Sequence, residues 1–387
     1  MIMLRRGAER RVRRGHCWIF SNEIAEPPVR TLEPGALHEL VDHAGRFIAT
    51  VYVNPKSLIT ARVLCRQKRG IDRSFFEERL RKAIAWRKRV LPHRDACRLV
   101  FSEADGIPGL VVDRYGSVLV LQSLTAGIDR FMEELLSIIV ALMAPKGVFV
   151  RNDSPFREME GVPLHKYLAY GDVPDVVEIS SGGLRFLVDI VNGQKTGFFL
   201  DQESNRDLMR KYVEQDSMIL DLFSYTGAWG MHALAAGAGE VTAVDSSKRA
   251  LQLAAIVAEL NGFFDRFKAI NQNAIEFLKQ HQTSWDMVIL DPPAFIKNRA
   301  GISHGIKGYI DINRRVLGHL KKGGILVTCS CSHHLDIPTF EKVLTSASVQ
   351  SGRTLRLLES RGQGPDHPML LAMPETRYLK LLVAQVV

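Results

Sequence analysis

The second half of the chain alternates short apolar runs with longer segments of helical periodicity. Four runs are almost continuously apolar, at Met218–Leu222, Glu240–Val244, Met287–Leu290 and Ile325–Thr328. Runs of this length are typical of strands buried on both faces, and helical segments lie between them. Parallel strands need a crossover connection, which is usually a helix. The pattern therefore predicts a doubly wound, mostly parallel sheet of the α/β class from about residue 211 onward.

The length of 387 residues exceeds that of one ordinary domain, so we expect two or three. Residues 1–71 predict a small all-β domain, residues 72–178 an α+β linker domain, and residues 179–387 the α/β domain. The predicted strands of the first domain are Leu37–Leu40, Phe47–Val53 and Ile59–Leu64. The second domain contributes the strands Val111–Tyr115, Val118–Leu124 and Val148–Arg151 and a helix at Ile128–Leu142.

Two short patterns near the N-terminus predict the positions of individual side chains. Ser74-Phe-Phe-Glu77 has the form of a capping box, so Ser74 is expected to cap the helix that follows. Trp18 and Phe20 follow a run of arginines. Basic residues beside aromatics suit a single RNA strand or loop, but we expect these two rings to lie in the core.

Positive charge is concentrated at the start of the chain. The first 98 residues carry 22 lysines and arginines against 10 aspartates and glutamates, whereas the remainder carries 29 against 32. Clustered positive charge favours a polyanion, because each neutralised phosphate releases condensed counterions. A solvated surface that aids solubility is the alternative. The distribution predicts a nucleic-acid partner.

Composition argues against several other classes of protein. No apolar run approaches the roughly 20 residues of a membrane helix, and the basic N-terminus has no apolar segment of a secretory signal after it. The five cysteines are odd in number and widely scattered, without the spacing of a zinc site. We therefore expect a cytoplasmic protein without disulfides or a metal.

A glycine-containing loop follows the first strand of the predicted sheet. The segment Asp221–Gly230 leaves a buried strand and opens a helix, and Gly227 permits a tight turn close to a ligand. Asp245 ends the next strand, where a carboxylate can bind both hydroxyls of a ribose. The loop lacks the glycine pattern of a dinucleotide site, so we predict S-adenosylmethionine, whose charged end suits Asp221. Phe223 is a further candidate contact, and Asn273 is a candidate for the adenine amino group.

Two more motifs follow strands of the same sheet. In Asp291-Pro-Pro-Ala-Phe295 the prolines restrict the backbone and hold Asp291 at the carboxyl edge, where open α/β sheets bind ligands. Phe295 offers a stacking face for an extruded base, whereas a rigid turn is the plainer reading. Cys329 and Cys331 end the following strand. A thiolate there would suit methylation of cytosine carbon 5, because addition of sulfur to carbon 6 activates carbon 5. Strand alternation puts both thiols on one face, so spacing does not choose between them.

Five segments together resemble the bacterial 23S rRNA large-subunit methyltransferase I family: Gly193–Gln202, Asn205–Arg206, Asp221–Gly230, Asp291–Phe295 and Ser330–Ser332. The resemblance covers essentially the whole chain. Residues 15–20 resemble part of a PUA domain, an RNA-binding β-barrel, and residues 102–115 resemble the linker domain of the family. The resemblance implies a Rossmann-like class I methyltransferase domain behind a PUA-like domain and a linker domain.

The resemblance also implies a reaction and its residues. It implies formation of 5-methylcytosine in 23S rRNA or a large-subunit precursor, with Cys331 as nucleophile because Ser-Cys-Ser is the shared triplet. Asp291 would contact the base edge. Many other RNA cytosine-5 methyltransferases carry a helper cysteine where this chain has Pro293-Ala294, so another general base is needed. Lys195 and Thr196 are candidate donors to the cofactor carboxylate or to RNA phosphate, although a simple turn explains them equally. A homodimer is one of the expected assembly states.

Two other functions stay open at the level of sequence. Methylation of a ring nitrogen or an exocyclic amine would need the Asp291 loop but no thiol. A non-catalytic ribosome-assembly or RNA-binding protein with a vestigial methyltransferase domain is the other. The presence of Asp221, Asp245 and Asp291 argues against that vestigial form.

Overall fold

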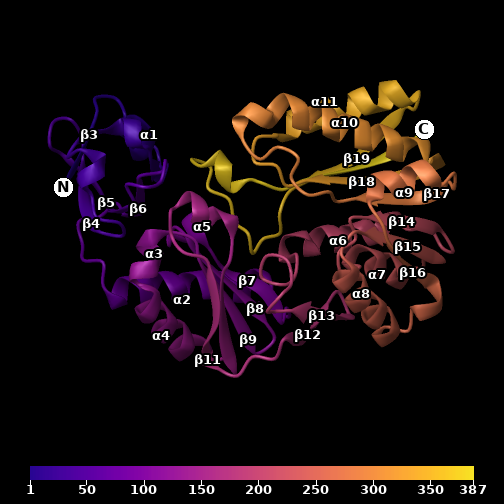
Figure 1. The fold of residues 1–387 in the computed structure, drawn as a ribbon, viewed down its shortest axis with the longest axis horizontal. Coiled ribbons are helices and arrows are strands. Elements are labelled where there is room, and N and C mark those ends of the chain that lie inside the picture. The colour runs from indigo at the N-terminus through magenta and orange to yellow at the C-terminus, as the bar shows by residue number, and fades with distance from the viewer. The chain divides into compact units, whose positions relative to one another are not determined.

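The computed structural model describes all residues 1–387, which divide into two compact units (Figure 1). The first unit comprises Met1–Ile179, Val188–Leu200 and Pro365–Thr376. The second comprises Ser180–Leu187, Asp201–Gly364 and Arg377–Val387. Neither unit is one continuous segment of chain. None of the helices combines the length and the apolar character that crossing a membrane requires.

The first sheet of the first unit has six strands in the order β2-β6-β5-β4-β1-β3. Its three longer strands, β4 (Leu37–Val41), β5 (Phe47–Val53) and β6 (Ala61–Cys65), confirm the predicted β-rich runs. The remaining elements are short: β1 (Ile2–Leu4), α1 (Glu9–Arg13), β2 (Trp18–Ile19) and β3 (Ile24–Glu26). Apolar side chains of these strands and of α1 form one core cluster, which makes this a small, mostly β structure.

The predicted burial of Trp18 and Phe20 is wrong. Both rings are only half-buried, whereas Ile19 between them is fully buried. Neighbouring side chains of an extended strand point to opposite sides, so one inward residue turns its neighbours outward. The Trp18 indole donates to Glu103 Oε1 at 2.7 Å, and the Arg11 guanidinium lies 5.0 Å from the centre of the Phe20 ring.

The second sheet of the first unit has five strands in the order β11-β10-β9-β8-β7. Three strands match predicted ones: β8 (Leu110–Tyr115), β9 (Val118–Ser123) and β10 (Gly147–Asn152). The sequence did not single out β7 (Ala96–Phe101) and β11 (His165–Gly171). The helices of this region are α2 (Arg73–Val90), α3 (Ala126–Arg130), α4 (Met132–Met143) and α5 (Pro155–Met159). Side chains of α2 and α4 pack with the strands in a second core cluster.

Two helical predictions in this region need correction. Asp72, and not Ser74, caps α2, because its carboxylate accepts from the Phe75 amide at 3.0 Å while the Ser74 hydroxyl donates to the same oxygen. The single helix expected at residues 128–142 is divided into α3 and α4 at Phe131. The backbone there has φ −104° and ψ 8°, and the Phe131 ring packs 4.9 Å from that of Phe76. Packing of a large side chain therefore outweighs helix periodicity at this position.

The second unit is built around a seven-stranded sheet in the order β16-β15-β14-β17-β18-β20-β19. Strands β14 to β18 are parallel, and β20 is antiparallel to both of its neighbours. Helices α6, α7 and α8 cover one face, and α9, α10 and α11 cover the other (Figure 1). The strand order reverses between β14 and β17. This doubly wound, mostly parallel arrangement confirms the predicted fold class, and such a reversal point is where α/β folds bind ligands.

Four strands correspond to the predicted runs: β14 (Met218–Leu222), β15 (Glu240–Asp245), β17 (Trp285–Leu290) and β18 (Leu320–Ser330). The sequence did not single out the other three, which are β16 (Phe267–Asn271), β19 (Leu355–Arg361) and β20 (Lys380–Val386). The helices are α6 (Glu203–Met209), α7 (Ala228–Ala235), α8 (Lys248–Leu260), α9 (Ala274–Gln280), α10 (Ile302–Gly318) and α11 (Ile337–Ser351). A two-stranded sheet of β12 (Val176–Ser181) and β13 (Leu184–Asp189) precedes them. Its two-residue turn is Gly182-Gly183, and both glycines have positive φ, as a tight hairpin requires.

Candidate active site

Four neighbouring strands of the second unit end in register at one edge of the sheet. Leu222 pairs with Val244 on one side and with Leu290 on the other, and Leu290 pairs with Thr328. The next residues along these strands are the predicted site residues Phe223, Asp245, Asp291 and Cys329. The parallel register therefore brings four separate motifs of the sequence to one edge.

The loop after β14 has an unusual backbone. Phe223, Tyr225 and Gly227 all have positive φ, at 61°, 49° and 75°. Non-glycine residues rarely adopt this region, and such residues cluster at ligand sites. A Cβ on Gly227 would lie 3.1 Å from the Phe267 ring and 3.2 Å from Ala254. The left-handed backbone conformations therefore define the shape of this loop, and Gly227 packs closely on its neighbours.

Asp221 is the most deeply buried carboxylate of this edge. It has no exposed surface, and its Oδ2 accepts from the Gly230 amide at 3.1 Å. Burial, and then repulsion from Asp291 and Asp245, raises the pKa of Asp221 well above its usual value. Its Oδ1 has no hydrogen-bond partner within the protein, and neither do the buried hydroxyls of Ser224 and Thr226. Buried polar atoms are normally hydrogen-bonded, so this group of acceptors and donors fits a polar ligand.

Asp245 is half-buried at the end of β15, and its carboxylate accepts hydrogen bonds from the backbone of two loops. Its Oδ2 accepts from the Tyr225 amide at 2.8 Å, and its Oδ1 accepts from the Ser247 amide at 2.8 Å. A carboxylate oxygen has two lone pairs, so each oxygen keeps one acceptor position. The carboxylate is thus held at the loop of β14 and retains the capacity to accept from two hydroxyls.

The three aspartates of this edge interact electrostatically. Both Asp291 and Asp245 act on the carboxyl of Asp221, and Arg206 opposes them only in part. A cationic ligand would relieve the repulsion among the carboxylates. S-adenosylmethionine carries a sulfonium and an ammonium, so its charge and its polar groups fit the residues found here.

Asp291 is oriented by residues that the sequence did not single out as site residues. Its Oδ2 accepts from Gln202 Nε2 at 3.0 Å and from the Trp229 indole nitrogen at 3.1 Å. Gln202 is itself held by Asn205, which donates to Gln202 Oε1 at 2.8 Å. Gln202 and Asn205 belong to the segments that carry the family resemblance. That resemblance was the signal that pointed to them.

The Asp291 loop is held against α10. A Cβ on Gly305 would lie 2.3 Å from Ile296 Cγ1 and 3.0 Å from the Phe295 carbonyl oxygen, so only glycine permits this approach. The Phe295 ring packs on that of Tyr309 with centres 4.6 Å apart. Phe295 is half-buried, so part of its surface stays accessible. The predicted stacking role of Phe295 remains a prediction.

The structure separates the two cysteines at the end of β18. Cys329 has no exposed surface, and its pKa is raised well above the usual thiol value by burial and then by Asp291. The side chains of Asp291 and Gln202 are among the neighbours that act on its pKa. Cys331 lies just beyond the strand and is partly exposed. Accessibility therefore favours Cys331 as the reactive thiol and gives Cys329 a role beside Asp291.

The serines that flank Cys331 share one partner. The Ser330 hydroxyl donates to Tyr309 Oη at 2.9 Å, and the Ser332 hydroxyl lies 2.9 Å from the same oxygen. The Ile296 amide also donates to Ser332 Oγ, at 3.2 Å. Burial raises the pKa of Tyr309, which keeps it a neutral phenol. Tyr309 of α10 therefore ties the Ser-Cys-Ser triplet to the Asp291 loop.

Three other predicted residues lie in less favourable positions. Thr196, in the first unit, is buried, and its hydroxyl donates its one proton to Asp113 Oδ2 at 2.6 Å. Lys195, also in the first unit, is exposed, and its ammonium lies 4.4 Å from the centre of the Phe199 ring. Asn273 caps α9, because its side-chain oxygen accepts from two amides of the helix. The side chains of Thr196 and Asn273 therefore give no support to the predicted cofactor contacts, which remain predictions for all three residues.

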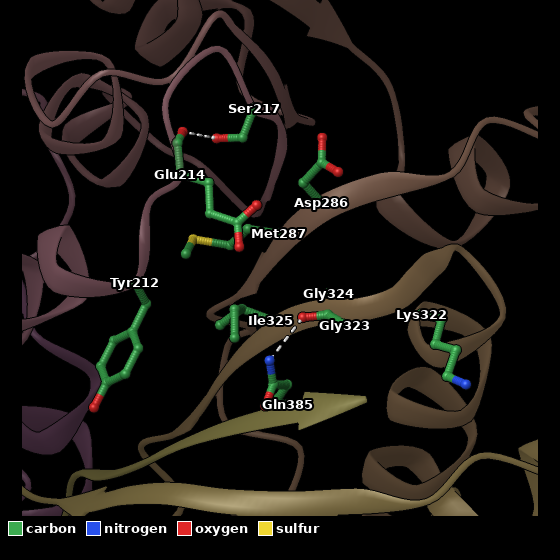
Figure 2. Close-up of a pocket in the computed structure, with 10 residues that line it drawn as sticks. All are labelled: Tyr212, Glu214, Ser217, Asp286, Met287, Lys322, Gly323, Gly324, Ile325 and Gln385. Atoms are coloured by element: carbon green, nitrogen blue, oxygen red, sulfur yellow. Dashed lines mark hydrogen bonds between the residues drawn. The ribbon is translucent and has the colours of Figure 1, made fainter. Parts of the chain in front are cut away.

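A cavity of about 140 Å³ lies at the other edge of the same sheet (Figure 2). Ser217, Asp286 and Gly324 line it at the amino ends of β14 and β17 and early in β18. Asp221, Asp291 and the cysteines lie at the carboxyl ends of these strands. The cavity is therefore not the predicted cofactor site.

Comparison with known proteins agrees with both parts of this description. Residues 2–66 match the model of a PUA-like domain, and residues 136–372 match the model of S-adenosylmethionine-dependent methyltransferases. The second match covers more than half of the chain. S-adenosylmethionine is thus the cofactor, as the loop of β14 and Asp245 predict.

Curated relatives match over the whole length of the chain. Ribosomal RNA large subunit methyltransferase I from Vibrio vulnificus is 37% identical over 100% of this chain and 99% of its own. The proteins of the same name from Alteromonas mediterranea and Cronobacter sakazakii are 36% and 35% identical, over 100% and 98% of this chain and 98% and 97% of their own. The chain belongs to the ribosomal RNA large subunit methyltransferase I family. The family resemblance found in the sequence is thereby confirmed.

Solved structures share the fold of this family member. A putative methyltransferase complexed with SAH superposes with a TM-score of 0.87 at 21% identity, covering 100% of this chain and 99% of the other. A putative SAM-dependent methyltransferase from Streptococcus mutans gives a TM-score of 0.86 at 21% identity, with the same coverage. Trm5b from Pyrococcus abyssi superposes less well, with a TM-score of 0.55 at 14% identity over 71% of this chain and 74% of the other. These similarities concern the fold alone.

Proposed function

We propose that this methyltransferase forms 5-methylcytosine in large-subunit ribosomal RNA, with Cys331 as the nucleophile. The observation that carries the proposal is a partly exposed thiol at the end of β18, on the strand next to the one that ends in Asp291. Carbon 5 of cytosine is a poor nucleophile and needs covalent activation, whereas a ring nitrogen does not. An accessible cysteine at this place therefore favours cytosine carbon 5.

The protein groups would act in a defined order. The Cys331 thiolate adds to carbon 6 of the cytosine, which gives carbon 5 the character of an enamine. S-adenosylmethionine, when bound, supplies the methyl group that carbon 5 accepts. Removal of the proton from carbon 5 then lets the carbon–sulfur bond break and returns the Cys331 thiolate. Asp291, held by Gln202 and Trp229, faces the base edge and orients its ring nitrogen or amino group.

The residues at the ends of β14 and β15 would hold the cofactor. Asp245 would accept from the ribose hydroxyls, and the acidic groups of Asp221 and Asp291 would attract the charged end. The loop with Phe223 and Gly227 would pass close to the cofactor with its strained backbone. Lys195, Thr196 and Asn273 are retained as further candidates, to be tested by substitution.

The substrate class is inferred from the family and from charge. The relatives are named as ribosomal RNA large subunit methyltransferases, and the basic first 98 residues of this chain include its PUA-like domain at residues 2–66. We propose 23S rRNA or a precursor of the large subunit as substrate and the cytoplasm as the compartment. All five cysteines are free. A homodimer stays a prediction, which light scattering of the purified chain would test.

Covalent trapping tests the reaction directly. An RNA that contains 5-fluorocytidine at the target cannot lose its carbon-5 substituent as a proton, so the enzyme should remain attached. Wild-type protein with S-adenosylmethionine should form an adduct that survives denaturation, and peptide mapping should place it at Cys331. Cys331→Ala should form none, whereas Cys329→Ala should still form it.

Two results would contradict the proposal. The first is the absence of any adduct with wild-type protein that methylates ordinary rRNA. The second is an undiminished adduct, or undiminished methylation, in Cys331→Ala. Full activity of the Cys329→Ala/Cys331→Ala double variant would instead favour methylation of a ring nitrogen or an exocyclic amine. Nucleoside mass mapping of the methylated rRNA would identify the product in either case.

A further inference from the structure

Lys380 is a charged residue in a place that favours apolar ones. It opens β20, whose sequence Lys-Leu-Leu-Val-Ala-Gln-Val is otherwise almost entirely apolar, and only 1% of the lysine is exposed. Lysine is almost never fully buried without a partner. Lys380 is paired across the sheet with Ser330, the residue directly before Cys331.

The ammonium of Lys380 is held beside the Ser-Cys-Ser triplet. Its Nζ donates to the Ser332 carbonyl oxygen at 2.6 Å and to the Tyr378 carbonyl oxygen at 2.7 Å. Neither acceptor carries a charge. An ammonium has three donors, so these two bonds leave one N–H for another acceptor. Lys380 is thereby anchored to the residues on both sides of Cys331, which places its charge in the neighbourhood of that residue.

Among the groups around Lys380, the sulfur of Cys331 interacts most favourably with its positive charge. Burial lowers the pKa of Lys380 to about 8, and among its neighbours the charge of Cys331 opposes this most strongly, ahead of Asp336. Arg377 acts in the same direction as burial. Cys329 and Tyr309 also interact electrostatically with Cys331, and burial raises the pKa of both, which keeps them neutral. Lys380 is thus the cation placed to balance a negative sulfur.

We propose that Lys380 is a positioning residue that holds Cys331 as a thiolate. The S–H bond of Cys331 breaks, its proton passes to solvent water, and the resulting thiolate is stabilised by the Lys380 ammonium in a thiolate–ammonium pair. No further reactant is needed. The use of this thiolate against cytosine rests on the proposed function, whereas the ion pair itself is a property of the free protein.

An ion pair of Lys380 with Cys331 would explain how this thiol is ionised at neutral pH. A thiol of ordinary pKa is only about 3% ionised at neutral pH, and only the thiolate is nucleophilic. His333 and His334 follow Cys331 closely in the sequence, but both are exposed. A buried ammonium acts through a medium of low polarity and is therefore the more effective group. Because Lys380 is already protonated in this pair, the proton of carbon 5 must leave to another acceptor.

The test is the pH dependence of alkylation of Cys331 in the full chain. Iodoacetamide modification is followed by peptide mass spectrometry, which separates Cys331 from Cys17, the other partly exposed cysteine. The proteins compared are wild type, Lys380→Met, Lys380→Arg and the control Lys321→Met. Lys321 lies near the start of β18, the strand that leads to Cys331. It is exposed and pairs with Asp286 at the opposite edge of the sheet.

Wild type and Lys321→Met should react with a midpoint below that of an ordinary thiol. Lys380→Met should raise the midpoint by about one pH unit or more, the usual effect of losing a close opposite charge. Lys380→Arg should restore it in large part. Binding of S-adenosylmethionine, measured by calorimetry, should be unchanged in all four proteins and reports correct folding, because the cofactor loops follow β14 and β15.

Two outcomes would overturn the inference. One is a wild-type midpoint at or above that of an ordinary thiol, which needs no variant to be informative. The other is an unchanged midpoint in a folded Lys380→Met protein. Either result leaves 5-fluorocytidine trapping at Cys331 unaffected. Conversely, a shifted midpoint without any RNA adduct would contradict the proposed function and keep the ion pair.

Discussion

Single carboxylates carry much of the electrostatic character of the cofactor site, and Asp221 is the extreme case. Because its pKa is raised, the folded chain holds a proton that the unfolded chain has already released. Ionisation of Asp221 therefore lowers the free energy of unfolding as the pH rises. The same buried charge would attract a cationic cofactor. Stability and cofactor binding thus make opposite demands on this residue.

We predict that Asp221→Asn separates these two demands. The amide keeps an acceptor for the Gly230 N–H but cannot ionise in the unfolded chain, so the melting temperature of the ligand-free protein at neutral pH should rise. Affinity for S-adenosylmethionine should fall roughly tenfold or more, since a charged hydrogen bond contributes about 1.5–3 kcal/mol. Differential scanning fluorimetry and calorimetry measure the two effects. Asp265→Asn, at an exposed aspartate, should change neither. A lower melting temperature with unchanged affinity would contradict this account.

Lys380 makes a second prediction, about stability and pH. Its pKa is lowered to about 8 in the folded chain from 10.5 in the unfolded chain. Between these values the unfolded chain binds a proton that the folded chain does not, so the free energy of unfolding of wild type rises with pH in this window. The full effect is about 3 kcal/mol. Urea unfolding between about pH 7 and 10.5 should show this rise in wild type and a weaker one in Lys380→Met. Parallel profiles for the two proteins would refute it.

At the residue scale, the sequence identified groups that end strands and missed groups that support them. Asp221, Asp245, Asp291 and Cys331 were predictable because each lies at or near the carboxyl end of a recognisable apolar strand. The hydrogen bonds to Asp291 come from residues 89 and 62 positions away in the chain, and no local pattern encodes such contacts. Lys380 did leave a local signal, as a lysine in an apolar strand, but β20 itself was not recognised.

Among the elements, α10 bears most directly on the site, because the Asp291 loop rests on its glycines. We predict that Gly305→Ala reduces methylation strongly, since the new Cβ would overlap Ile296 Cγ1 and push the loop away from the helix. Gly318→Ala in the same helix meets nothing within 4 Å and should stabilise the protein by up to about 1 kcal/mol. Methyl transfer to rRNA and thermal unfolding measure both variants. Equal activity of the two would show that the close approach at Gly305 is unimportant.

Elements were predictable where burial gives a clear period. Strands β14, β15, β17 and β18 were found as continuous apolar runs because both of their faces are covered. Strands β16 and β19 lie at the two edges of the sheet, where exposed polar residues interrupt the apolar pattern. The cap of α2 and the break between α3 and α4 depend on single side-chain contacts, which periodicity does not describe.

On the scale of the whole molecule, the uneven distribution of charge is the feature that bears on function. Many basic side chains of the first unit are used in ion pairs, such as Arg13 with Asp42 and Arg62 with Glu160. Arg5, Arg6 and Arg10 are exposed at the start of the PUA-like domain. These three are therefore the candidates to meet RNA phosphate.

We predict that Arg5→Ala/Arg6→Ala/Arg10→Ala weakens rRNA binding and reduces its dependence on salt. Each lost phosphate contact should lower the slope of log affinity against log salt by about 0.7–0.9. Filter binding of a 23S rRNA fragment at several salt concentrations measures the slope. Arg356→Ala/Arg361→Ala removes two exposed charges from β19 and should leave the slope unchanged. An unchanged slope in the triple variant would mean that RNA lies elsewhere on the protein.

The antiparallel strand β20 has a consequence for synthesis of the protein. It is inserted between β18 and β19, although it follows both of them in the sequence. A nascent chain therefore emerges from the ribosome with the loops of β14 and β15 well before Lys380. We expect such a chain to be able to assemble the methyl-donor site while its cysteine is still a weakly reactive thiol. The reactive sulfur would appear only when the last strand enters the sheet, which protects the unfinished chain from adventitious alkylation and oxidation.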